Sequence, residues 1–362
     1  MEAEMTELKH YLQLNAIQLR RCDGLFARYR RLAMNPEHCA PMVIVNLPEP
    51  ETPSWEERLA DPLVMLRSEL DELRQHMEIG DDRVPSVRVE FGTPQVAAAF
   101  GCEIFIPSNN LPAAGSHVLK RAEDIYQLPI PALDAGWYGK LAEWTEVWKA
   151  NLPRGVVMQL PDIQSPFNSA HLIRGNDIFL DFFDHPAELD LLLDKVTNFM
   201  IRITRHMKAA LAGEPGWFMD WGAYWKGYAR ISNCSMHMIS PAYYRQHVLE
   251  RDVRFFEAVG GGRVHYCGTA PEVIDDFFKI PGLSGLDVDC ALQDFWDLCD
   301  RAPRNVVLMP TLGLAPDSPE IERLLSGDWP RKRNIIIVVS AASIEEGRDL
   351  LGRLRASIPG VH

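Results

Sequence analysis

The chain has 362 residues, of which 47% are hydrophobic and 24% charged, a balance typical of a folded globular protein rather than a disordered or fibrous one. Its 37 basic and 50 acidic side chains give a net charge of −13, which repels a phosphate backbone and argues against nucleic acid as a partner. The N-terminus has no basic segment followed by an apolar core, and no apolar run reaches bilayer length, so we expect no membrane span and a cytoplasmic location.

Helical and β-rich segments alternate along the sequence. Apolar residues recur at helical spacing from Thr6 to Leu32, which predicts a helical N-terminal extension over residues 1–40. We expect residues 41–362 to form one domain. Its predicted β-strands are Met42–Pro48, Ser86–Phe91, Gly155–Leu160, Gly216–Trp221, Gly262–Cys267, Ser284–Asp289, Asn305–Pro310 and Asn334–Ser340. Its predicted helices are Trp55–Met77, Trp137–Asn151, Ala187–Leu211, Pro241–Val259, Ala270–Lys279, Leu292–Arg301, Ser318–Leu325 and Ile344–Ala356.

Eight strands alternating with helices favour parallel pairing through right-handed crossovers, and hence an α/β fold. The count matches a (β/α)₈ TIM barrel, and a doubly wound sheet is the alternative. The interval from Phe91 to Trp137 is rich in turn residues, which predicts a hairpin or a lid-like excursion from the barrel.

In such a barrel the chemistry is carried by residues at the carboxyl ends of the strands. These positions are unusually polar here, which indicates a site for a small-molecule substrate. They are occupied by Asn46, Glu90, Gln159, Asp162, Asp220, His265, Cys267, Asp287, Asp289 and Ser340.

His265 and Cys267 are separated by one residue at the end of a predicted strand, so both side chains point to the same side, toward the barrel axis. An imidazole and a thiolate are typical ligands of Zn²⁺. The seven cysteines lack tight spacing and are typical of free thiols in a reducing compartment. The alternative is an ordinary core pair, in which a buried thiol lies beside a histidine that bonds a carbonyl.

The segment Gly216–Tyr228 is crowded with aromatic side chains, among them Trp221 and Tyr224. We interpret it as the wall of an apolar substrate cavity, with a cluster between barrel and helices as the alternative. Asp220 within it is a candidate buried acid with a raised pKa, although capping or ion pairing is the commoner role of such an aspartate.

The segment beginning at Ser165 and Pro166 has the pattern of a capped helix start at the barrel mouth. Free backbone N–H groups there can hold a carboxylate or phosphate, or the helix start can be purely structural. Ser165, Asn168 and Gln159 are therefore candidate substrate-binding residues.

Four segments in order along the chain resemble the uroporphyrinogen decarboxylase superfamily, and most of all its branch of cobalamin-related methyltransferases. They are "VEFGTPQVAAAFGCEI" (Val89–Ile104), "SPFNSAHLIRG" (Ser165–Gly175), "NCSMHMISPAYYRQHVLERD" (Asn233–Asp252) and "RVHYCGTAPEVIDDFFKIPGLSGLDVD" (Arg263–Asp289). The resemblance implies a (β/α)₈ barrel over about residues 40–345. It also implies a zinc site in which the His-x-Cys motif is His265 and Cys267.

Two departures limit what the resemblance implies. The arginine-rich "RQAGR" motif of porphyrin decarboxylases is absent, since the corresponding strand reads "VIVNLPEPE". Where the methyltransferases have a second zinc cysteine near the last strand, this chain has Ser340. Serine is a poor zinc ligand because its hydroxyl stays protonated near neutral pH, so the metal is either absent or completed by another residue. The candidates for that third ligand are Cys234, Cys290, His237, Glu90 and Asp289.

The leading hypothesis is a methyltransferase that moves a methyl group between a corrinoid-type donor, carried by a partner protein, and a thiol activated by zinc. A second hypothesis is a decarboxylase of a carboxylated small molecule, in which Asp220 or Glu90 protonates a carbanion-like intermediate. A third is a barrel that binds a corrinoid or a small acid without turnover, because a fold alone does not establish catalysis.

Overall fold

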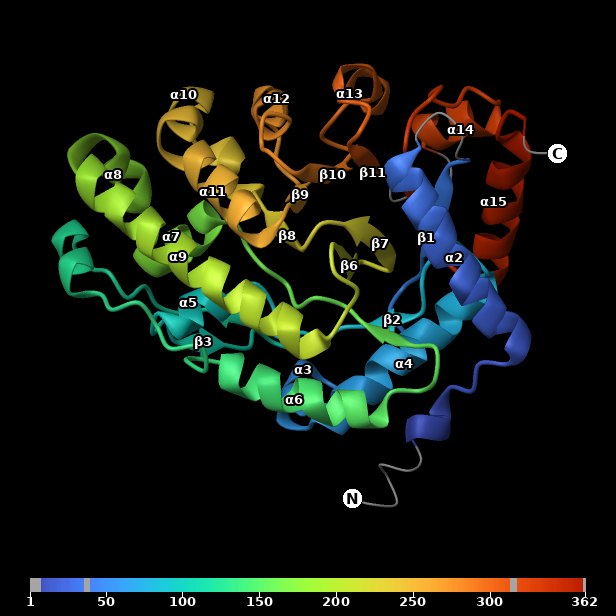
Figure 1. The fold of residues 1–362 in the computed structure, drawn as a ribbon, viewed down its shortest axis with the longest axis horizontal. Coiled ribbons are helices and arrows are strands. Elements are labelled where there is room, and N and C mark those ends of the chain that lie inside the picture. Colours follow the sequence, from blue (N-terminus) through green and yellow to red (C-terminus); the bar gives the residue numbers. More distant parts are fainter. Residues whose placement is uncertain (1–7, 36–39, 313–317, 361–362) are drawn as a thin grey trace.

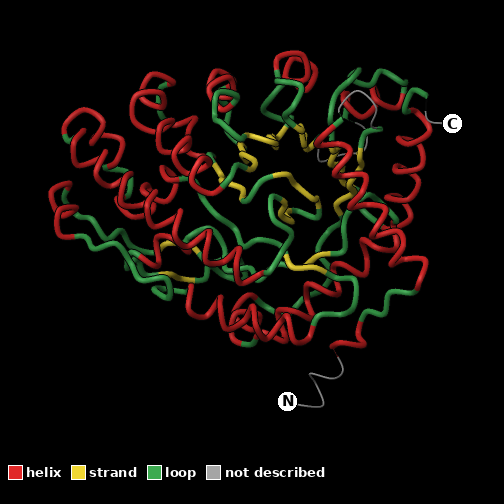
Figure 2. The backbone as a smooth tube through the Cα atoms, in the orientation of Figure 1, coloured by secondary structure: helices red, strands yellow, loops and turns green. Residues whose placement is uncertain are grey.

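The computed structural model describes residues 8–35, 40–312 and 318–360, and its helices lie outside an inner set of strands (Figure 1, Figure 2). Within the predicted N-terminal extension, α2 (Ala16–Met34) is helical, whereas residues 1–7 and 36–39 lie outside the described residues. Asn15 caps α2 by accepting hydrogen bonds from the N–H groups of Ile17 and Gln18. No helix in the described part of the chain combines the length and the apolar character that crossing a bilayer requires.

Six strands form a parallel sheet in the order β1-β12-β11-β10-β9-β8. The first strand of the chain thus lies beside the last, which is typical of a barrel-like arrangement and not of a doubly wound sheet. The strands are β1 (Met42–Asn46), β8 (Ala229–Ser232), β9 (Gly262–Tyr266), β10 (Leu283–Asp289), β11 (Val307–Thr311) and β12 (Ile336–Ser340).

Two shorter parallel strands, β2 (Ser86–Val87) and β5 (Val157–Met158), pair with each other. Backbone hydrogen bonds link their segments to the two edges of the sheet. On one side the Asp82 N–H donates to the Val43 carbonyl at 2.9 Å, and on the other the Ser165 N–H donates to the Ser232 carbonyl at 2.9 Å. The strands therefore follow one another around a common centre (Figure 2).

One predicted strand is present but does not belong to the parallel series. The segment Gly216–Trp221 contributes β6 (Trp217–Asp220), but β6 pairs antiparallel with β7 (Ala223–Lys226) in a hairpin that lies inside the ring of strands (Figure 1). Trp221 and Gly222 form its two-residue turn with positive φ values of 49° and 68°, a conformation that suits the twist of a hairpin. The strand that follows β5 around the ring is β8, "ARIS", which is short and carries a buried arginine.

The remaining predicted helices are present, with different bounds. Asp61 and Pro62 divide the predicted helix Trp55–Met77, because Asp61 caps a new helix that has Pro62 at its first position. The predicted hairpin between Phe91 and Trp137 is confirmed as β3 (Ile104–Phe105) and β4 (Ala113–Ala114). The helices are α3 (Trp55–Ala60), α4 (Pro62–Ile79), α5 (Gln95–Ala99), α6 (Tyr138–Asn151), α7 (Pro166–Arg174), α8 (Ile178–Asp184), α9 (Pro186–Leu211), α10 (Pro241–Tyr243), α11 (Leu249–Val259), α12 (Ile274–Phe277), α13 (Phe295–Arg301), α14 (Pro319–Leu325) and α15 (Ile344–Ser357).

Two apolar clusters lie on opposite faces of the strands. In β1, Val43 and Val45 join the larger cluster between strands and helices, whereas Met42 and Ile44 join the smaller one inside the ring. The smaller cluster also contains side chains from α2 and from the hairpin, including Phe218. The hairpin and α2 therefore fill the interior of the ring with apolar side chains, and open space is left at the carboxyl ends of the strands.

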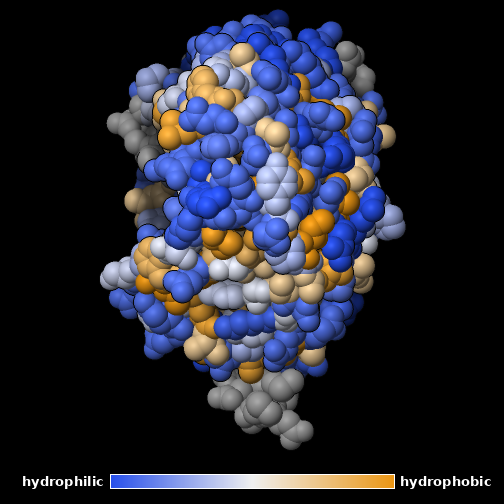
Figure 3. Space-filling view, turned by 90° about the vertical axis from the view of Figure 1, so that its left-hand side faces the viewer, coloured by the Kyte–Doolittle hydropathy of each residue, from blue (hydrophilic) through white to orange (hydrophobic). Residues whose placement is uncertain are grey.

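The outer surface is mainly polar. Figure 3 views the side of the molecule that carries α8, and hydrophilic residues predominate there, with apolar ones between them. Leu180 and Phe183 of α8 are among the exposed large apolar side chains. Apolar residues of this kind are common on protein surfaces, and we assign no function to them.

The packing of the hairpin predicts that a larger side chain at Gly285 in β10 would destabilise the protein. A Cβ atom there would lie 2.3 Å from the Trp225 ring, which is buried inside the ring of strands. We expect Gly285→Ala to lower the free energy of unfolding by about 1–3 kcal/mol, measured by urea denaturation. Gly352→Ala in α15 is the control, because nothing lies within 4 Å and alanine is the better helix former. Equal stability of the two variants would contradict this packing.

Candidate metal centre

Three potential metal ligands meet at the carboxyl ends of two neighbouring strands. His265 lies in β9, Cys267 follows that strand, and Cys234 begins the short 3₁₀ turn Cys234–Met238 after β8. One ligand atom from each of the three lies within 4.8 Å of the others. Cys234, one of the candidates for the third ligand, is the residue that the fold brings to His265 and Cys267.

The strand register explains why these residues converge. Ser232 of β8 lies opposite His265 of β9, and the Asn233 N–H donates to the His265 carbonyl at 2.8 Å. Two residues further on, the same register brings Cys234 beside Cys267. Asn168 of α7 supports this turn, because its side-chain oxygen accepts a hydrogen bond from the Ser235 N–H at 3.1 Å.

Asp287 orients His265 from the adjacent strand. The two residues are register partners in β10 and β9, and the Nδ1 atom of His265 bonds a carboxylate oxygen of Asp287. Burial by itself would lower the pKa of His265, but the attraction of Asp287 outweighs it and raises the pKa to about 9. With Nδ1 held by a carboxylate, Nε2 is the nitrogen left for a metal, an arrangement common in metal sites.

A hydrogen bond joins the two cysteines. The Sγ atoms of Cys234 and Cys267 are 2.7 Å apart. The hydrogen bond from Cys234, together with one from His265, lowers the pKa of Cys267 to about 5, whereas its bond to Cys267 and its burial raise the pKa of Cys234. Two thiolates on one tetrahedral zinc ion are about 3.8 Å apart, given Zn–S bonds of about 2.3 Å. The donor types therefore suit zinc, and its binding would require the sulfur atoms to separate by about 1 Å.

The other candidates for the third ligand lie elsewhere. Ser340 is in β12, which β10 and β11 separate from β9, so it is remote from the cluster in the sheet. His237 is exposed and its Nδ1 bonds the Cys234 carbonyl at 2.6 Å. Asp289 accepts a hydrogen bond from the Ala291 N–H. Cys290 is buried beyond the end of β10, and Glu90 lies beside Arg88.

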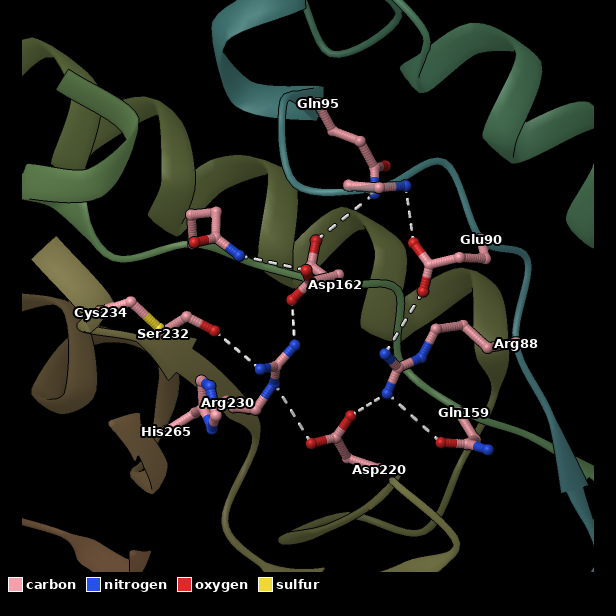
Figure 4. Close-up of polar contacts among 12 residues, drawn as sticks. Arg88, Glu90, Gln95, Gln159, Asp162, Asp220, Arg230, Ser232, Cys234 and His265 are labelled. Carbon is pink, nitrogen blue, oxygen red and sulfur yellow. Dashed lines mark hydrogen bonds and ion pairs between the residues drawn. The ribbon is translucent and has the colours of Figure 1, made fainter. Parts of the chain in front are cut away.

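A network of buried charges lies next to the cluster, inside the ring of strands (Figure 4). Arg230 bonds Asp162 and Asp220 and donates to the Ser232 hydroxyl at 2.7 Å. Arg263 joins Asp220 to Asp287, which holds His265. The buried ion pairs of the interior therefore also help to orient His265, a candidate metal ligand.

Asp220 is the centre of that network. Burial would raise the pKa of its carboxyl group, but Arg263, Arg88 and Arg230 outweigh burial and lower the pKa to about 2. The raised pKa expected for Asp220 was therefore wrong. An aspartate held ionised among three guanidinium groups does not supply a proton near neutral pH, so its geometry favours a structural role.

A cavity of about 370 Å³ lies beside Trp221, and none of the three candidate ligands lines it. Trp221 lines it, and its ring centroid is 5.2 Å from that of His265. Glu90 and Gln159 also line it, and both contact Arg88, as Figure 4 shows. Burial, partly offset by Arg88, raises the pKa of Glu90. Of the residues expected to bind or act on substrate, Glu90, Gln159 and Trp221 face this cavity.

Three other expected substrate-binding residues do not line it. Tyr224 lies on the far side of the hairpin, where it stacks on Trp217 at 5.0 Å and donates to a Glu214 oxygen at 2.7 Å. Ser165 is buried and caps α7 by accepting a hydrogen bond from the Asn168 N–H. A sequence pattern alone could not distinguish these positions, because the hairpin that turns Tyr224 away was not predicted.

Comparisons with known proteins show what the chain is similar to. No family model matches the chain, and a search of curated proteins also finds no match. Among solved structures, the chain is similar to a methyltransferase from Methanosarcina mazei, with a TM-score of 0.67 and 17% sequence identity. The match covers 92% of this chain and 97% of that one. At this level of identity the similarity shows a shared fold.

Removing the charge of Asp220 should destabilise the protein strongly. We expect Asp220→Asn to lower the free energy of unfolding by about 3–5 kcal/mol at neutral pH, because three buried arginines lose their common partner. Asp328→Asn, which breaks an exposed pair with Arg323, should cost at most about 1 kcal/mol.

The pH dependence of that difference provides a second check. The folded-state pKa of Asp220 is about 2, below the value of about 3.9 for an unfolded chain. Its contribution to stability is therefore present above about pH 4 and is lost as the pH falls through about 2. The difference in unfolding free energy between wild type and Asp220→Asn should become smaller as the pH falls through this range. A difference that does not change with pH would contradict the lowered pKa of Asp220.

Proposed function

We propose that this protein is a methyltransferase-type enzyme of the uroporphyrinogen decarboxylase superfamily, with its strands closed into a (β/α)₈ barrel. In this proposal Cys234, His265 and Cys267 hold a zinc ion that activates a substrate thiol. The observation that carries it is the convergence of two thiols and a carboxylate-oriented imidazole on adjacent strand ends. The shared fold with a methyltransferase supports the reaction class.

Three protein ligands are what this chemistry needs. A zinc site with three protein ligands keeps a fourth position for substrate, and bound zinc lowers the pKa of a thiol so that it is a thiolate at neutral pH. In the protein itself, Asp287 fixes the orientation of His265. Asn168 and the β8–β9 register fix the turn that carries Cys234. Trp221 presents an apolar ring between the cluster and the cavity, where it limits access of water.

The substrate in this proposal is a small thiol held in the cavity beside Trp221. The methyl donor is a corrinoid-type group delivered by a partner protein, because the described cavity of about 370 Å³ is sized for a small molecule and not for a corrinoid ring. Glu90 and Gln159, which face the cavity, then contact the part of the substrate away from its thiol.

Zinc content tests the proposal directly. Protein purified without chelator should contain about one zinc ion per chain, and Cys234→Ser, His265→Ala and Cys267→Ser should each weaken zinc binding by at least about 100-fold. Competition with a chromogenic chelator under reducing conditions measures the affinity. Cys290→Ser and Ser340→Cys are matched controls, and both should retain wild-type affinity because neither position lies in the cluster.

The results of these zinc measurements test the metal and its third ligand separately. If the reduced wild-type protein takes up no zinc at micromolar concentration, the zinc-dependent methyltransferase is excluded. If Cys234→Ser binds zinc as tightly as wild type, the third ligand has been assigned wrongly. Circular dichroism of each variant distinguishes a lost ligand from a lost fold.

A second function, decarboxylation of a carboxylated small molecule, is favoured by Glu90 alone. Burial raises the pKa of this carboxyl group, it faces the cavity, and Arg58, Arg83 and Arg88 line the same cavity. The "RQAGR" motif is absent, and these arginines share the cavity with Glu49, Glu69, Glu72 and Glu90. Glu90 is then the proton donor for the carbanion that loss of CO₂ leaves.

Glu90→Gln distinguishes the two functions. A decarboxylase should lose about 10²–10⁴-fold in kcat because the proton donor is gone, whereas a zinc-dependent methyltransferase should keep its zinc affinity and most of its rate of thiol methylation. Steady-state assays of CO₂ release and of thiol methylation make the comparison. Zinc binding without either turnover would favour the third possibility, a barrel that binds a corrinoid or a small acid without catalysis.

A further inference from the structure

A second cavity, of about 430 Å³, lies on the other side of the β6–β7 hairpin. It is enclosed by the hairpin, α2, the ends of α6 and α9, and the strand segment around β5, elements that Figure 1 shows close together. Most of its lining is apolar. The apolar residues are Phe26, Leu152, Val157, Met158, Leu160, Leu211, Ala212, Trp217, Phe218 and Met219.

The two cavities share a wall but no lining residue. Along the β5 segment, Met158 and Leu160 face the second cavity, whereas Gln159 between them faces the cavity beside His265. The Leu160 N–H donates to the Met219 carbonyl of the hairpin at 3.0 Å, which joins the strand segment to β6. The second cavity is therefore separate from the candidate metal centre.

Its charged lining is basic, although the whole chain carries a net charge of −13. Arg30, Lys149 and Lys208 line it together with one acid, Glu214. That acid is already paired, since it bonds Arg30 and accepts a hydrogen bond from the Tyr224 hydroxyl. Arg30 is paired with Glu214 and Lys149 with Glu146, so Lys208 is the lining cation that would pair with an anionic occupant.

Lys208 is the residue best placed to meet that anion. Its side chain is only 7% exposed, and its ammonium donates to the Trp217 carbonyl. The nitrogen lies 5.9 and 5.4 Å from the ring centroids of Phe218 and Tyr228. Among the described carboxylates, none forms an ion pair with it, and burial lowers its pKa to about 8. A buried ammonium without an anionic partner, at the edge of an apolar cavity, is costly unless a ligand pairs with it.

We propose that this cavity binds a monocarboxylate with an apolar body. The carboxylate accepts hydrogen bonds from the Lys208 ammonium, and the apolar body packs against Met158, Leu160 and the side chains of β6. Lys149 adds positive charge at the same cavity. The ligand would thus be recognised by one buried cation and by the apolar lining of a cavity of limited size. These features suit a medium-chain fatty acid or an acid of similar dimensions.

Calorimetric titration of the full chain with decanoate tests the site. Wild type should bind one equivalent, and decan-1-ol, which has the same chain without the carboxylate, should bind at least about tenfold more weakly because a hydrogen-bonded charge pair is lost. Lys208→Met should weaken decanoate binding by a similar factor, and Lys208→Arg should restore part of it. Lys226→Met is the matched control, since Lys226 is an exposed lysine on the same hairpin that does not line the cavity.

A second variant tests the cavity without removing its charge. Met158→Trp should fill the space and abolish decanoate binding, while circular dichroism of the variant shows that it is folded. The proposal is wrong if wild type does not bind decanoate, if decanoate and decan-1-ol bind equally, or if Lys208→Met and Met158→Trp bind like wild type. Because zinc content and decanoate binding are measured separately, failure of one does not imply failure of the other.

Discussion

Three arginines inside the ring of strands converge on one aspartate, and the rest of the site depends on that interaction. Asp220 lies at the end of β6, and its partners Arg88, Arg230 and Arg263 come from three different positions around the ring. Four charges removed from water are costly unless each is paired with good geometry. The attraction between Asp220 and the three arginines therefore fixes how far the hairpin extends into the interior. The position of the hairpin in turn fixes the floor of the cavity beside Trp221.

The same network orients the candidate metal ligands. Arg263 bonds both Asp220 and Asp287, and Asp287 in turn holds the imidazole of His265. Because these residues occupy inward-facing positions of adjacent strands, the parallel register alone brings them into one row. Three ion pairs, Asp220–Arg263, Arg263–Asp287 and Asp287–His265, thus connect the hairpin to the candidate metal ligands.

The spacing of apolar and polar residues in the sequence predicted the strands and helices that contain long apolar runs. His265 and Cys267 were identified because period-two spacing is visible in the sequence, and Tyr266 between them does pack in the outer cluster. The strand β8 was missed because four residues that include an inward-facing arginine carry no apolar signature. Since Cys234 is positioned only by the register of β8, the sequence left it as one of several candidates for the third ligand. The direction of the Asp220 pKa was likewise set by arginines distant in the sequence.

The position of the second thiol determines where the ligands of the proposed centre lie among the strands. In the resembling methyltransferases the second cysteine lies near the last strand, whereas Ser340 occupies that strand here and the second thiol comes from the turn after β8. All three ligands of the proposed centre therefore lie on two adjacent strands. The opposite arc of strands remains available to line the cavity, where Asn46, Thr311 and Val338 provide neutral side chains. Charged side chains such as Arg58, Glu69 and Arg88 line the rest of the cavity, so in the proposed function a substrate beside Trp221 meets both neutral and charged groups.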